Sequence, residues 1–123
     1  MRKGVMVFVF LLCLCMLQSQ ENDKKIALLI GNSKYDGTAW SRLKNVENDI
    51  RVMKEAMEKI GFTIFEGKAY ENIDVKEMKE VIQRFENEIG KYRIVCFYYS
   101  GHGIELKNGK QYLIGINAPS AQE

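Results

Sequence analysis

The chain has 123 residues, of which 46% are apolar and 28% are charged, and its net charge is +2. This length and balance fit one globular domain and exclude a disordered, low-complexity or collagen-like chain. No internal repeat is visible in the sequence.

The first twenty residues differ in composition from the rest. Arg2 and Lys3 precede an uncharged apolar run over residues 4–17, which is short for a bilayer span, and a polar stretch follows. This layout predicts a signal peptide at 1–20, with an uncleaved N-terminal anchor as the alternative, and one domain at 21–123. The protein is then expected to be secreted or periplasmic, or cytoplasmic if the start codon is misassigned.

Removal of residues 1–20 changes both the charge and the cysteine content. Arg2 and Lys3 leave the 18 basic residues, so 16 basic residues remain against 16 acidic ones. A neutral domain without a basic stripe gives no reason to expect a nucleic-acid partner. Of three cysteines only Cys96 remains, which excludes an internal disulfide and is typical of a buried apolar position.

Apolar runs and helical spacings alternate from Lys24 onward. Residues 24–32 and 93–99 are continuous apolar runs typical of central parallel strands, and residues 62–70 supply a further strand. Two helices are predicted between them, and the second opens at Asp74 with a capping box to Glu77. Their apolar stripes are Leu43, Val46, Ile50, Met53, Met57 and Ile60 in the first, and Val75, Met78, Ile82, Phe85 and Ile89 in the second.

The order strand, helix, strand, helix, strand predicts an α/β fold. Its sheet is expected to be mostly parallel, with helical crossovers. After the last of these strands, residues 103–117 are expected to form a hairpin that turns at Asn108 and Gly109.

The single histidine of the chain directly follows the third predicted strand, in the order Ser100, Gly101, His102, Gly103. Ligands of open parallel sheets bind beyond the carboxyl ends of the strands, and residues 32–38 are expected at the same edge. Glycine lets the backbone approach a ligand closely, and Gly103 can offer its N–H beside the imidazole. The alternative is a plain turn with a solvated histidine.

Three stretches carry a family resemblance: KKIALLIGNSKY, RLKNVENDIRVMKEAMEKIGF, and IVCFYYSGHGIE followed by YLIGINAP. In order and spacing they resemble the large-subunit domain of caspase-like cysteine peptidases, over roughly residues 24–120. The resemblance implies an α/β/α sandwich, incomplete in this chain. It also implies that His102 is the general acid or base beside a cysteine nucleophile, and that the Gly103 N–H binds the oxyanion.

The nucleophile of that family is missing from the expected place. In caspases the histidine lies about 50 residues upstream of the cysteine motif, which is beyond Glu123 in this numbering. Cys96 precedes His102 on the same predicted strand and is not a substitute. The expectation is therefore a fragment of a longer peptidase, inactive by itself, or a secreted non-catalytic caspase-like binding module.

The residues around Asp49 indicate the branch of the family. Aspartate-specific caspases hold the substrate with an arginine where this chain has Leu43, and Arg42 lies one residue earlier. The sequence from Leu43 to Asp49 is more similar to paracaspases and metacaspases, which implies that Asp49, with Ser100 nearby, binds an Arg or Lys side chain of the substrate. An acid on a solvated helix start is the simpler alternative.

The resemblance also sets the expected partners. It implies protein or peptide substrates, no cofactor and no metal, and it allows a homodimer through segments outside this chain. A nucleotide-binding domain is disfavoured, because GNSKYDG after the first strand matches neither phosphate-loop pattern.

Overall fold

A computed structural model describes residues 9–12 and 24–119 of the chain. Its main sheet contains β1 (Val9–Leu12), β2 (Lys25–Gly31), β3 (Phe62–Ile64), β4 (Tyr70–Glu71) and β5 (Ile94–Ser100). The strand order is β1-β5-β2-β3, and β4 also pairs with β2. The neighbours β5, β3 and β4 all run parallel to β2, while β1 is antiparallel to β5. The predicted, mostly parallel α/β fold is confirmed.

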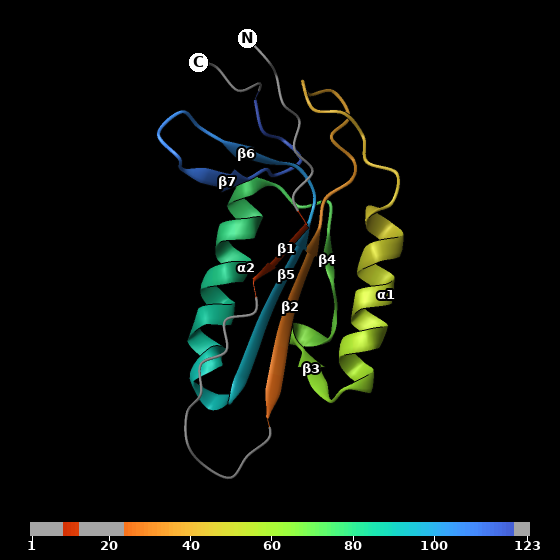
Figure 1. Cartoon of the computed structure of the whole chain (residues 1–123), viewed down its shortest axis with the longest axis vertical. Coiled ribbons are helices and arrows are strands. Elements are labelled where there is room, and N and C mark those ends of the chain that lie inside the picture. The colour runs from red at the N-terminus through yellow and green to blue at the C-terminus, as the bar shows by residue number, and fades with distance from the viewer. Residues whose placement is uncertain (1–8, 13–23, 120–123) are drawn as a thin grey trace.

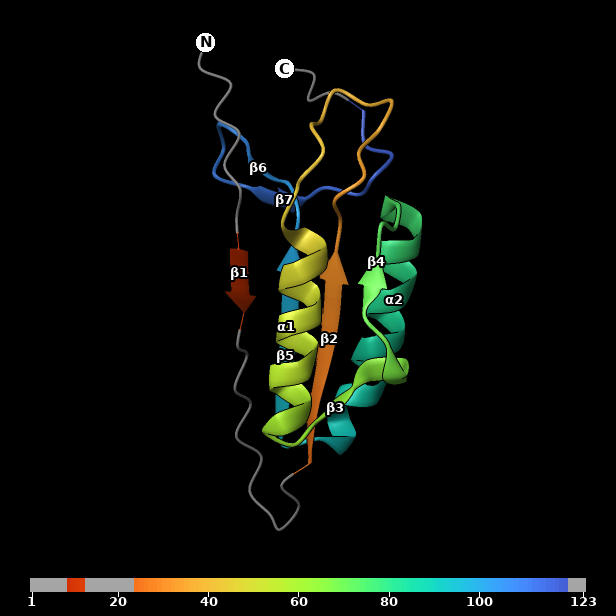
Figure 2. The same cartoon turned by 90° about the vertical axis from the view of Figure 1, so that its right-hand side faces the viewer.

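The two helices cover opposite faces of the sheet, as Figures 1 and 2 show. Along β2, Ala27 and Leu29 face α1 (Val46–Lys59), whereas Ile26, Leu28 and Ile30 face α2 (Val75–Glu88). This alternation follows from the strand period of two, and burial on both faces explains why the run is apolar without interruption. Among the described residues, neither helix is long and apolar enough to cross a membrane.

The capping box at the start of α2 is confirmed. Asp74 is the N-cap residue, and its carboxylate accepts a hydrogen bond of 2.8 Å from the Glu77 N–H. The predicted stripe of α2 was wrong in one detail: Val75 is 44% exposed, and Val81 is buried instead. The first turn of the helix lies beyond the sheet, so its apolar residue has no core to face. Likewise Ile60 lies past the end of α1 and is 59% exposed.

The predicted strand at 62–70 is broken into two. A short 3₁₀ turn, η1 (Phe65–Gly67), separates β3 from β4. Glu66 and Gly67 have φ values of +52° and +73°, which no strand accommodates. Gly67 adopts this left-handed conformation readily, and the Glu66 carboxylate lies 2.9 Å from the Nε of Arg84 in α2.

A second turn, η2 (Ile89–Lys91), follows α2 and leads into β5. After β5 the chain forms the expected hairpin, β6 (Gly103–Glu105) paired antiparallel with β7 (Gln111–Leu113). Gly109 has a φ of +78°, and the Asn108 side chain accepts from the Lys110 N–H. The predicted signal peptide, residues 1–20, lies outside the described residues except for β1.

Candidate active site

The carboxyl ends of β2 and β5 lie together. The register pairs Gly31 with Ser100, and the Asn32 N–H donates to the Ser100 carbonyl at 2.8 Å. The parallel strands therefore bring two loops to one edge of the sheet, residues 32–45 and the Ser-Gly-His-Gly turn, and the sequence predicted this for residues 32–38 and for the turn.

His102 is buried at that edge, with 1% of its surface exposed. Its Nε2 lies 2.7 Å from the Ser41 carbonyl oxygen. A carbonyl only accepts, so Nε2 carries the proton and a neutral ring keeps its lone pair on Nδ1. Among the described residues Nδ1 has no hydrogen-bond partner. The interpretation of His102 as a solvated turn residue is therefore wrong, because the ring is buried and is oriented by the Ser41 carbonyl.

Two aromatic rings from the loop after β2 enclose the imidazole. The Tyr35 ring meets it edge-on, with 4.6 Å between centroids, and the Trp40 ring lies 5.4 Å away at a tilt of 45°. The Trp40 indole N–H also donates to the Pro119 carbonyl at 3.1 Å. The loop and the segment after β7 thus enclose His102 between them.

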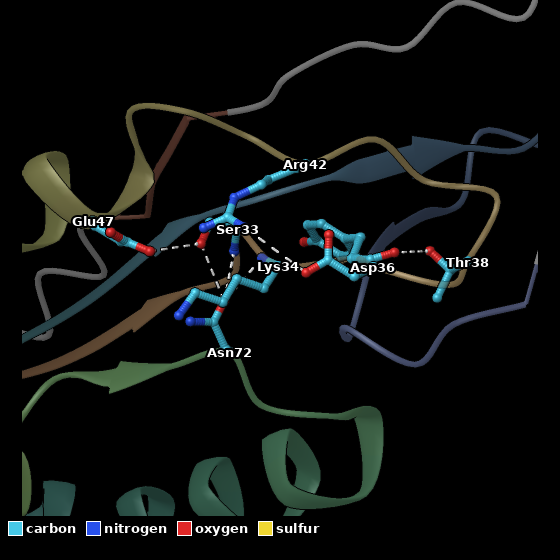
Figure 3. A network of polar contacts seen from close by, with 8 residues as sticks. Ser33, Lys34, Asp36, Thr38, Arg42, Glu47 and Asn72 are labelled. Atoms are coloured by element: carbon cyan, nitrogen blue, oxygen red, sulfur yellow. Dashed lines mark hydrogen bonds and ion pairs between the residues drawn. The ribbon is translucent and has the colours of Figure 1, made fainter.

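A network of polar contacts holds this loop in shape (Figure 3). Asn72, which has a φ of +54°, accepts hydrogen bonds from the Ser33 and Lys34 N–H groups at 3.0 and 2.9 Å. The Leu43 N–H donates to the Ser33 carbonyl and closes the loop on itself. Thr38 accepts from the Trp40 N–H at 3.1 Å. The loop that carries the Ser41 carbonyl is therefore held by bonds within itself and by the Asn72 side chain from the loop after β4.

Asp49 and Ser100 both act on the Tyr98 hydroxyl. Asp49 is half-buried in the first turn of α1, and Ser100 is the buried last residue of β5. Burial and the Asp49 carboxylate raise the pKa of Tyr98, while its hydrogen bond with the Ser100 side chain acts in the opposite direction. Both residues therefore influence the hydroxyl of Tyr98, which belongs to the core cluster on the face of the sheet that α1 covers.

The other predicted residues take the following places. Gly103 is the buried first residue of β6 and pairs with Leu113. Arg42 is exposed and lies 3.9 Å from the equally exposed Asp36, a pair of little energetic weight. Cys96 is buried on the α1 face of β5. Within residues 9–12 and 24–119, no group of three or more His, Cys, Asp or Glu side chains is placed to hold a metal ion.

Sequence reasoning missed Ser41, Tyr35, Tyr99 and Trp40 as contributors to this site. Ser41 acts through its carbonyl, which every residue has, so its side chain carried no signal. Tyr35 and Tyr99 were attributed to a loop and a strand, although each is fully buried with its hydroxyl near the His102 turn. A signal for Tyr99 was present, since two successive tyrosines place one hydroxyl on each face of a buried strand.

The fold and the site together define an α/β domain that presents one buried, oriented histidine at the carboxyl edge of a parallel sheet. The family model described as caspase domain matches residues 24–121. The chain belongs to the caspase domain family. Membership of this family suggests a cysteine peptidase activity. No curated protein and no solved structure gives a significant match.

Proposed function

We propose that this chain supplies the histidine part of a cysteine endopeptidase site of the Cys/His type. The observation that carries the proposal is the orientation of His102, whose Nε2 lies against the Ser41 carbonyl while its buried Nδ1 has no partner among the described residues. A buried polar atom without a hydrogen-bond partner destabilises a fold. A role as the general base, which must exchange a proton with the reacting groups, explains why Nδ1 is left unpaired.

The chemistry assigned to these residues is acyl transfer. A cysteine thiolate adds to the scissile carbonyl carbon, and the oxyanion that forms accepts from the Gly103 N–H. The imidazolium of His102 gives its Nδ1 proton to the leaving amine, and a thioester remains. Neutral His102 then takes a proton from water as that water attacks the thioester, and the acid product and thiol are released.

Cys96 does not fit the role of nucleophile. It is 1% exposed and lies four residues before Ser100, a distance of about 13 Å along a strand. The family's cysteine motif falls about 50 residues after the histidine. We therefore expect the 123-residue chain by itself to be inactive.

We further propose that the enzyme cleaves after Arg or Lys, as paracaspases and metacaspases do. Asp49 supports this, because its half-buried carboxylate lies in the first turn of α1 and acts on Tyr98 beside Ser100. A carboxylate in such a position can bind a guanidinium through two parallel hydrogen bonds. Arg42, the residue that an aspartate-specific enzyme would use, is instead exposed next to Asp36.

The test compares the recombinant 123-residue chain with the native protein purified from its source. Fluorogenic peptides ending in Arg, Lys and Asp are the substrates. We expect the native protein to hydrolyse the Arg and Lys peptides, and expect no turnover by the 123-residue chain. The thiol reagent iodoacetamide should abolish the native activity, and His102→Ala in the native sequence should do the same.

Two results would contradict the proposal. Turnover by the pure 123-residue chain that is lost on Cys96→Ser would place the nucleophile on β5. A folded native protein that cleaves none of the three peptides, and still binds a peptide or protein partner, would instead favour the non-catalytic binding module.

A further inference from the structure

We infer that Tyr35 and Tyr99 are positioning residues for His102: their two buried hydroxyls hold the backbone of the His102 turn, and so keep Nε2 of the imidazole against the Ser41 carbonyl. We call these residues the tyrosine pair. The inference rests on the proposed function, since the orientation of the ring has a purpose only at a site that transfers protons.

The tyrosine pair binds the histidine backbone on both sides of its Cα atom. The His102 N–H donates to the Tyr35 hydroxyl at 3.0 Å, and the Tyr99 hydroxyl donates to the His102 carbonyl at 2.8 Å. The two hydroxyl oxygens are themselves 3.3 Å apart. The peptide groups before and after the imidazole are therefore fixed by neighbouring atoms of one polar cluster.

The same cluster reaches the segment after β7. The Ile114 carbonyl lies 3.1 Å from the Tyr35 hydroxyl and 3.0 Å from the Tyr99 hydroxyl. The Ile114 N–H in turn donates to the His102 carbonyl at 3.0 Å. The tyrosine pair thus joins three segments of the chain at the histidine: the loop after β2, the end of β5, and the exit from the hairpin.

Both hydroxyls keep their protons and remain donors. Burial raises the pKa of Tyr35, and burial together with the neighbouring Tyr35 raises that of Tyr99. Two protons are then shared among the His102 carbonyl, the Ile114 carbonyl and the contact between the hydroxyls. With Tyr35 donating to the Ile114 carbonyl and Tyr99 to the His102 carbonyl, each carbonyl receives one hydroxyl proton, and the contacts of the Tyr99 hydroxyl with Ile114 and with the Tyr35 hydroxyl carry none.

The tyrosine pair also accounts for the glycine before the histidine. A Cβ atom on Gly101 would overlap the Tyr99 hydroxyl and would lie 2.9 Å from the Tyr35 hydroxyl. Only a residue without a side chain lets both hydroxyls reach the backbone on either side of position 102. Phenylalanine would fill the same buried space, so the bonds to the His102 turn are what the two hydroxyls add to packing.

The test uses the full 123-residue chain labelled with ¹⁵N. Because His102 is the only histidine, the two imidazole nitrogen signals belong to it alone. At a pH where the ring is neutral, we expect the protonated nitrogen to be Nε2, identified by its couplings to both carbon-bound ring protons. Hydrogen exchange of the His102 amide, read in the same sample, reports on its bond to Tyr35.

The variants are Tyr35→Phe and Tyr99→Phe, with Tyr112→Phe as the matched control because Tyr112 is 47% exposed on β7. We expect each of the first two to raise the ratio of the Nδ1–H to the Nε2–H tautomer about fivefold, which is the equivalent of one hydrogen bond of about 1 kcal/mol. Exchange of the His102 amide should accelerate by a similar factor. Tyr112→Phe should change neither.

A purely structural role would lower the melting temperature and leave the tautomer ratio unchanged, and that result would overturn the inference. If neither variant folds, the unmodified chain still decides, because an Nδ1–H tautomer or an equal mixture in it is incompatible with the inference. The tautomer ratio in Gly101→Ala gives an independent check of the inference. Gly90→Ala is its control, since a Cβ at Gly90 meets no atom within 4 Å.

The two proposals fail separately. Tautomer changes as expected, together with a native protein that cleaves no peptide, would remove the peptidase and leave the tyrosine pair as positioning residues of a non-catalytic site. Activity that depends on His102, with a tautomer ratio indifferent to both tyrosines, would remove only the inference.

Discussion

Replacing Asn32 by alanine tests how the loops at the carboxyl edge of the sheet are joined. Asn32 is fully buried directly after β2. Its side-chain oxygen accepts from the Ile73 N–H at 3.0 Å, and its amide nitrogen donates to the Ile114 carbonyl at 3.3 Å. One side chain therefore links the end of β2 with the loop before α2 and with the segment after β7.

The expected cost is dominated by one orphaned donor. In Asn32→Ala the buried Ile73 N–H loses its acceptor, which costs about 1–3 kcal/mol. The Ile114 carbonyl keeps the Tyr35 hydroxyl as a donor, so the loss of its bond to the Asn32 side chain adds little. The substitution also leaves a small cavity, so we expect the free energy of unfolding to fall by about 2–3 kcal/mol. For a domain of this size, the melting temperature should then fall by about 10–20 °C.

Urea and thermal denaturation of the 123-residue chain, followed by circular dichroism, measure this difference. Asn45→Ala is the matched control, because Asn45 is exposed and its side chain makes no capping bond at the start of α1. It should stay within about 0.5 kcal/mol of the unmodified chain. An Asn32→Ala variant as stable as this control would show that water or a local shift satisfies the Ile73 N–H, and would refute the reasoning.

Three further predictions concern specificity, packing and processing. In the native protein, Asp49→Ala should lower kcat/KM for Arg peptides by about 30-fold or more, because loss of one partner of a desolvated charge pair costs about 2–5 kcal/mol. A preference for Asp peptides that Arg42→Ala abolishes would exclude the role of Asp49 in binding Arg or Lys. Val46→Asp should unfold the chain, since Val46 is 5% exposed between α1 and the sheet, and far-UV circular dichroism of the variant checks it. N-terminal sequencing of the native protein should begin near Gln20 or Glu21, and an intact Met1 on a cytosolic product would contradict the predicted signal peptide.

The sequence predicted the parts of the fold in which local and tertiary preferences agree. The apolar run of β2 is buried on both faces, and Asp74 caps α2 as its spacing to Glu77 indicates. The strand at 62–70 was mispredicted because it was read through Glu66 and Gly67, both of which have a positive φ, although a glycine inside a strand pattern is a turn signal.

Of the candidate site, the sequence could predict only those residues whose side chains themselves take part in it. His102 stood out as the single histidine after a buried strand, and Asp49 as an acid at a helix start. The partner of the imidazole is the Ser41 carbonyl, however, and a backbone atom leaves no trace in residue identity. The tyrosine pair became visible only when the fold brought Tyr35 and Tyr99, 64 residues apart, to the same turn.

The pairing of β1 with β5 has a consequence for the predicted removal of residues 1–20. Val9–Leu12 covers the edge of β5 from Phe97 to Ser100, and these four residues lie inside residues 1–20, the predicted signal peptide. Cleavage would leave the backbone groups of an apolar strand uncovered on that side, and such an edge is a template for pairing with other chains. We therefore expect the chain without residues 1–20 to self-associate increasingly as its concentration rises. The chain that keeps these residues should not show this concentration-dependent self-association.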